Sequence, residues 1–182
     1  MSQPRKVYPG QTVQLTRRTL RRHFLLRPDA QLNQLVFYLV AFFAQKFGMQ
    51  LSAIQVLSDH YHMVLTDVLG LLPDFMRELN RIMALCVKVL RNWEGPVWEP
   101  DAASVVELLT PEAAAQAMVY TWLNAVRAGL VSDPRDWPGV TTSLDDVDGP
   151  TTVVKRPELY LNASSGRWPE TVELRITMPR PQ

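Results

Sequence analysis

Two long segments of the chain carry apolar residues at every third or fourth position, which is typical of an amphipathic helix packed on a core. The first begins at Pro28-Asp29 and is predicted to run to about Phe47, where Gly48 ends it. The second begins at Pro73-Asp74 and is predicted to end near Asn92. The apolar stripe of the first segment is formed by Leu32, Leu35, Val36, Leu39, Val40 and Phe43.

Shorter apolar segments around these helices predict four strands, within residues 7–19, 51–57, 61–66 and 103–109. The middle two are separated only by a tight turn near Ser58-Asp59, so they form either a hairpin or one bent strand. The resulting order is β-α-β-β-α-β. We therefore expect an α+β fold of the ferredoxin-like type, with an antiparallel sheet.

A third helix is predicted from Thr110 to the neighbourhood of Val131. Thr110 can cap its first turn, Pro111 suits the first helical position, and Gly129 is placed to end it. This helix is an addition to the six-element fold.

The C-terminal part of the chain has a different character, and we predict one domain over residues 1–142 followed by an extension over 143–182. Residues 145–167 have the composition of a loop, whereas residues 172–178 alternate like a strand. A lone strand needs a partner edge. It either joins the main sheet or belongs to a longer C-terminal region that is truncated here.

Composition and length indicate a globular chain with a substantial core: 182 residues, of which 47% are hydrophobic. The single cysteine, Cys86, falls on an apolar stripe and is expected to be buried. The N-terminus does not resemble a signal peptide, and the longest apolar stretch, Leu35–Ala44, is too short to span a bilayer. By elimination, we expect a cytoplasmic protein.

The net charge of +1 conceals a local excess of positive charge between residues 5 and 27. This stretch holds seven basic residues and no acidic one, and in the whole chain arginine outnumbers lysine fifteen to four. Arginine binds phosphates through paired donors and stacks on bases. We interpret the stretch as a surface that contacts nucleic-acid phosphates, the alternative being an ordinary solvated strand and turn. The candidate contacts are Arg5, Lys6, Arg17, Arg18, Arg21 and Arg22.

The most informative local pattern is a pair of histidines, His60 and His62, at the start of a predicted strand. Residues i and i+2 of a strand point to the same face, about 7 Å apart. Tyr61 and Met63 then face the other way. Imidazole is a common metal ligand, so the pair is a candidate metal site; otherwise both are ordinary half-buried polar residues.

The third helix aligns three polar side chains, because Tyr120 and Asn124 are four residues apart and Arg127 lies one turn further. Taken alone, such a stripe is usually solvated surface.

In combination, these segments resemble the REP-associated tyrosine transposases, a branch of the HUH single-tyrosine transposases. The resemblance is carried by the stretches 5–19, Asp59-His60-Tyr61-His62 and 120–131, with Asp136-Trp137-Pro138-Gly139 behind them. Two positions depart from the family pattern. Family members commonly have Asn where this chain has Asp59, and Pro where it has Ala125.

The resemblance implies a DNA transposase that cleaves and rejoins DNA next to hairpins. Tyr120 would be the catalytic nucleophile, forming a 5′-phosphotyrosine with a free 3′-OH. Mg²⁺ or Mn²⁺ would be held by His60, His62 and Asn124, and single-stranded or hairpin DNA by the basic residues and Arg127. The sequence leaves open whether the protein acts as a monomer or a homodimer.

Two other functions remain open at this point. The chain could be a non-catalytic protein that binds DNA or RNA hairpins, descended from a transposase. A metal-dependent hydrolase of small phosphoesters is less well supported, because it needs a water-activating base and more carboxylate ligands than the sequence offers.

Overall fold

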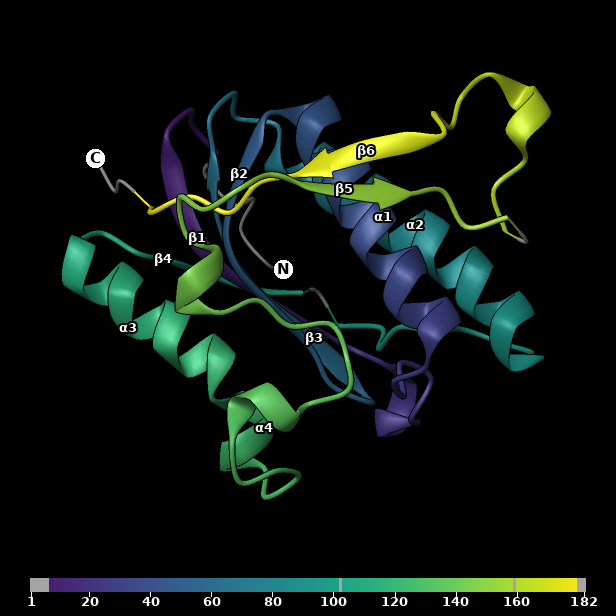
Figure 1. The fold of residues 1–182 in the computed structure, drawn as a ribbon, viewed down its shortest axis with the longest axis horizontal. Helices are drawn as coiled ribbons and strands as arrows, with labels where there is room; N and C mark the ends of the chain where they lie inside the picture. Colours follow the sequence, from purple (N-terminus) through teal and green to yellow (C-terminus); the bar gives the residue numbers. More distant parts are fainter. Residues whose placement is uncertain (1–6, 102, 159, 180–182) are drawn as a thin grey trace.

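The computed structural model describes residues 7–101, 103–158 and 160–179, and its centre is a four-stranded antiparallel sheet (Figure 1). The strands are β1 (Gln11–Arg18), β2 (Met49–Val56), β3 (His60–Asp67) and β4 (Ser104–Glu107), in the order β2-β3-β1-β4. Helices α1 (Ala30–Phe47) and α2 (Leu72–Arg91) pack on one face of the sheet, and α3 (Pro111–Trp122) packs on the other. The predicted ferredoxin-like α+β order is confirmed.

Successive side chains of β3 point to opposite faces of the sheet, and both faces are covered, so nearly the whole strand is buried. Tyr61, Met63 and Leu65 belong to the large core beneath α1 and α2. Val64 instead packs with α3 in a small second core, and His62 shares its face. The prediction that the histidines and Tyr61 point in opposite directions is therefore confirmed.

The predicted ends of the first two helices are close to the observed ones because local capping sets them. The side chain of Asp29 accepts a hydrogen bond from the Leu32 N–H at 2.8 Å, and Gly48 closes α1 in the left-handed conformation with φ of 69°. Asp67, which is fully buried at the end of β3, accepts from the N–H groups of Leu71 and Leu72. These bonds satisfy donors at the start of α2 that no helical carbonyl can reach.

The prediction of one continuous helix from Thr110 to Val131 was wrong. The observed α3 ends at Trp122, and a separate turn, α4 (Asn124–Arg127), follows Leu123. In an unbroken helix the Ala125 N–H would donate to the carbonyl of Thr121. Here it donates to the side-chain oxygen of the buried Gln55 at 3.0 Å. The break therefore comes from a contact with β2, some 70 residues away in the chain.

The C-terminal region contains two strands, where one was predicted. The chain forms β5 (Thr152–Lys155) within the segment that we expected to be loop, and β5 pairs antiparallel with β6 (Thr171–Leu174). Val172, Leu174 and Trp168 join the main core, so the hairpin packs over α1. Ile176 also forms a single parallel bridge with Leu51 of β2. Short 3-10 turns complete the connections: Leu20–Arg22, Pro134–Asp136, Leu144–Asp146 and Ala163–Ser165.

Two apolar features singled out from the sequence belong to the interior. The stretch 35–44 lies in α1, and most of its side chains are buried in the core. Cys86 of α2 is buried, and burial raises the pKa of its thiol to about 11. Across the described residues, no helix combines the length and the apolar character needed to cross a membrane.

Candidate active site

The two histidines of β3 lie against each other, with ring centroids 4.8 Å apart and ring planes at 90°. Each has one ring nitrogen engaged by a neighbour. His60 Nδ1 lies 2.6 Å from the carboxylate of Asp59, and His62 Nδ1 lies 2.7 Å from the hydroxyl of Thr16 on β1. Such partners fix the ring orientation and leave the Nε2 atoms for other contacts, as metal-binding histidines commonly require.

The donors present fit a divalent ion that keeps several open positions. Among the described residues, no cluster of three or more His, Cys, Asp or Glu side chains could hold a metal, so two imidazoles are the core of any site here. Asn124, the third predicted ligand, is buried at the start of α4 and does not line the cavity that His62 lines. Because Mg²⁺ prefers oxygen ligands and imidazole suits transition metals, this set favours Mn²⁺ of the two predicted ions.

His62 is held in its neutral form. Its side chain is buried, and burial together with the nearby His60 and Arg18 lowers its pKa to about 3, against a smaller opposing effect of Asp59. A neutral imidazole is the form that can bind a metal ion. The structure therefore keeps this residue ready for a ligand throughout the neutral pH range.

The low pKa of His62 predicts that the apoprotein loses stability in mild acid. Above pH of about 6.5, His62 is neutral in both the folded and the unfolded state. Below this pH the His62 imidazole binds a proton in the unfolded chain but stays neutral in the folded protein. The free energy of unfolding should therefore fall by up to about 2 kcal/mol by pH 5. Urea unfolding of wild type and His62→Gln, followed by circular dichroism with a chelator present, measures this. An equal decline in both proteins would contradict it.

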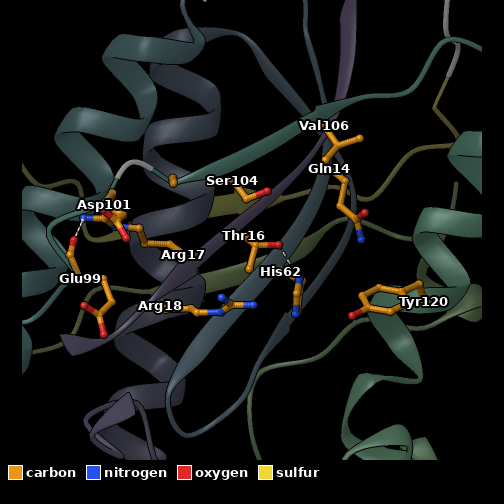
Figure 2. A pocket seen from close by; sticks show the side chains of 11 residues that line it. Gln14, Thr16, Arg17, Arg18, His62, Glu99, Asp101, Ser104, Val106 and Tyr120 are labelled. Atoms are coloured by element: carbon orange, nitrogen blue, oxygen red, sulfur yellow. Dashed lines mark hydrogen bonds between the residues drawn. The ribbon is translucent and has the colours of Figure 1, made fainter. Parts of the chain in front are cut away.

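Tyr120 and His62 line the same cavity, of about 370 Å³, and Figure 2 shows the tyrosine hydroxyl directed toward His62. Its ring centroid is 5.6 Å from that of His62, at 90°, and the tyrosine is 41% exposed. The guanidinium of Arg127 lies over the same ring at 5.1 Å. Of the predicted catalytic and metal-binding residues, His62 and Tyr120 line this cavity, His60 contacts His62, and Asn124 lies at the first position of α4 outside the lining.

Gln55 is a site residue that sequence reasoning missed. It is fully buried on β2, accepts from Ala125 N–H, and donates to the carbonyl of Trp122 at 3.1 Å. It thus ties both sides of the α3–α4 break to the sheet and fixes the end of the helix that presents Tyr120. A proline at position 125 could not donate this bond. The signal in the sequence was a lone glutamine inside the apolar segment 51–57.

The structure bears out only part of the predicted basic surface as exposed positive charge. Arg18, Arg21 and Arg22 are exposed, and Arg18 lines the cavity beside His62. Arg17 lines it too, but its guanidinium donates to the carbonyls of Glu99 and Asp101 and lies near the ring of Trp98. Arg5 and Lys6 lie outside the described residues.

The fold is shared with a solved structure of a REP-associated tyrosine transposase bound to a REP hairpin. The TM-score is 0.65 at 21% sequence identity, covering 80% of this chain and 85% of that one. A candidate transposase from Deinococcus radiodurans R1 aligns with a TM-score of 0.46 and 22% identity, over 66% of this chain and 95% of that one, which is too distant to define a common fold. No protein-family model and no curated protein matches the chain. The resemblance to REP-associated tyrosine transposases is thus confirmed at the level of the fold.

Proposed function

We propose that this chain is a DNA strand transferase that cleaves and rejoins single-stranded DNA next to hairpins, with Tyr120 as the nucleophile. The observation that carries the proposal is the placement of Tyr120 beside His62 in a cavity that Arg18 also lines. It is supported by the shared fold of a transposase that was solved with a hairpin bound. Hairpin DNA is accordingly the partner we propose.

The proposed reaction exchanges one phosphoester bond for another. The phenol oxygen of Tyr120 attacks phosphorus and forms a new P–O bond, while the bond from phosphorus to the 3′ oxygen of the neighbouring nucleotide breaks. The phenol proton is lost to solvent, and the 3′ oxygen takes up a proton. The products are a 5′-phosphotyrosine and a free 3′-OH, and the reverse reaction rejoins the strand, so no nucleotide cofactor is needed.

His60 and His62, together with the amide of Asn124, are the residues that would hold a divalent ion. When bound, such an ion polarises a phosphate oxygen and offsets the charge that develops there. The other tasks fall to the protein itself. The Arg18 guanidinium binds the phosphate electrostatically, and the Asp59 and Thr16 side chains keep the two imidazoles oriented.

A covalent adduct assay tests the proposal. The full chain is incubated with Mn²⁺ and a labelled oligonucleotide that carries a hairpin flanked by single strands, and the products are resolved on a denaturing gel. We expect a labelled band at the mass of protein plus DNA. Tight binding without any adduct would instead support a non-catalytic hairpin-binding protein.

The exposed arginines predict a specific salt dependence of DNA binding. Each phosphate neutralised on a single strand contributes about −0.7 to the slope of log affinity against log salt concentration. Replacing Arg18 and Arg22 with glutamine should therefore flatten the slope by roughly one to two units and weaken binding to unrelated sequences alike. Fluorescence anisotropy across a salt titration measures this slope.

The matched control removes the same charge elsewhere. Arg77 and Arg81 are also exposed, but they lie on α2 and pair with Asp74 and Glu78. Replacing both with glutamine should leave the slope unchanged. If the Arg18/Arg22 variant keeps the wild-type slope, DNA is held at another surface.

A further inference from the structure

Gln14 is a polar residue of this site that has no role in the proposed reaction. It lies on β1, paired in register with Val106 of β4 and Val64 of β3. Figure 2 shows its carboxamide pointing toward the space between His62 and Tyr120. Its Nε2 is buried and has no hydrogen-bond partner in the described part of the chain. A buried amide donor without a partner costs free energy, and because Gln14 lines the cavity, its carboxamide can recover that energy by turning toward a bound ligand.

The cavity around Gln14 is larger and chemically more varied than a phosphate site requires. Its volume of about 370 Å³ reaches the range of small-molecule pockets, which begins at about 300 Å³. Arg18 lies at its edge, but Glu99 and Asp101 line it as well. Carboxylates repel a phosphate, whereas they accept hydrogen bonds from the amino groups of a nucleobase.

Apolar surface suited to a base is present beside these polar groups. The side chain of Val106 is 53% exposed and lines the cavity across the strand pair from Gln14. The exposed ring of Tyr120 also lines the cavity, below Gln14 in the view of Figure 2. Aromatic and apolar faces stack on bases regardless of sequence, while hydrogen bonds to the base edge supply discrimination.

We propose that this cavity holds the base of the nucleotide adjoining the phosphate that Tyr120 attacks, and that Gln14 reads its edge with a preference for adenine. The carboxamide offers a donor and an acceptor side by side, which is the arrangement that pairs with N7 and the amino group of adenine. The subsite rests on the proposed function for the identity of its ligand. Gln14 is thereby a determinant of base preference next to the cleaved bond.

The test measures binding in protein that cannot react. The full chain with Tyr120→Phe, and the same chain with Gln14→Ala added, are titrated by fluorescence anisotropy with short labelled oligo(dA), oligo(dC) and oligo(dT) in the presence of Mn²⁺. The Tyr120→Phe protein, which retains Gln14, should bind oligo(dA) roughly tenfold more tightly than oligo(dT). Gln14→Ala should remove that preference while its affinity for oligo(dT) stays unchanged. Gln50→Ala, at an exposed glutamine of β2, should retain it.

Three results would overturn the subsite: an equal preference for adenine with and without Gln14, a uniform loss of affinity for all three oligonucleotides, or no binding to any of them. A thermal melt of each variant identifies any loss that comes from unfolding, and Gln14→Asn, which keeps the amide, should retain part of the preference if the fold tolerates the change. Adduct formation by the wild type is scored separately. Its absence would overturn the proposed function while leaving the measured base preference intact.

Discussion

Replacing Tyr120 with phenylalanine is expected to abolish covalent attachment of DNA, lowering adduct formation by at least about a thousandfold, as losses of catalytic nucleophiles do. Only the oxygen that would attack phosphorus is removed. The side chain is 41% exposed, so the fold should be unaffected, and DNA affinity should stay close to that of the wild type. The measurement is the yield of protein–DNA adduct on a denaturing gel, with affinity determined in parallel by anisotropy.

Tyr160 provides the matched control for this variant. Its hydroxyl also lies near the surface, where it donates to the side chain of Gln31 on α1, and its ring packs against the core on the opposite face of the sheet from α3. Tyr160→Phe should form adduct at the wild-type rate. An adduct that persists in Tyr120→Phe would assign the nucleophile to another residue.

The second large effect is expected at the histidine pair. His62→Ala removes one of two imidazoles and should eliminate both Mn²⁺ binding and adduct formation, because among the described residues no other cluster of ligands could replace it. Mn²⁺ binding is followed by the loss of the free-ion signal in electron paramagnetic resonance, which reports on the metal without requiring activity.

The third histidine offers the control for this experiment. His23 is exposed, lies against Trp93, and does not line the cavity. His23→Ala should bind Mn²⁺ as the wild type does. If His62→Ala still bound Mn²⁺ with wild-type affinity, the ion would not be held by this pair.

Local patterns were sufficient to predict the framework of the site. The strand period placed His60 and His62 on one face, and the structure brings their rings together. Capping residues such as Asp29 and Gly48 set the ends of α1 close to where they were predicted. These features depend on residues close together in the sequence, so they can be read without knowledge of the fold.

The parts that could not be predicted depend on contacts between distant segments. The third helix breaks because Gln55 of β2 takes the Ala125 N–H, and nothing near Ala125 in the sequence signals this. Thr16 orients His62 only because β1 and β3 pair in one register. Strand β5 forms in a loop-like stretch because β6 provides its edge and α1 its core. Asp59, a departure from the family pattern, proves to hold His60 in place.

Mass spectrometry of the wild-type adduct identifies the residue that attacks the DNA phosphate. The protein is incubated with Mn²⁺ and hairpin-flanking DNA, then digested with nuclease and protease, and the peptides are searched for a residual nucleotide. We expect a 5′-linked nucleotide phosphate on the peptide that contains Tyr120, attached at that residue. A nucleotide mapped to any other side chain, or bound DNA that leaves no modified peptide, would contradict it.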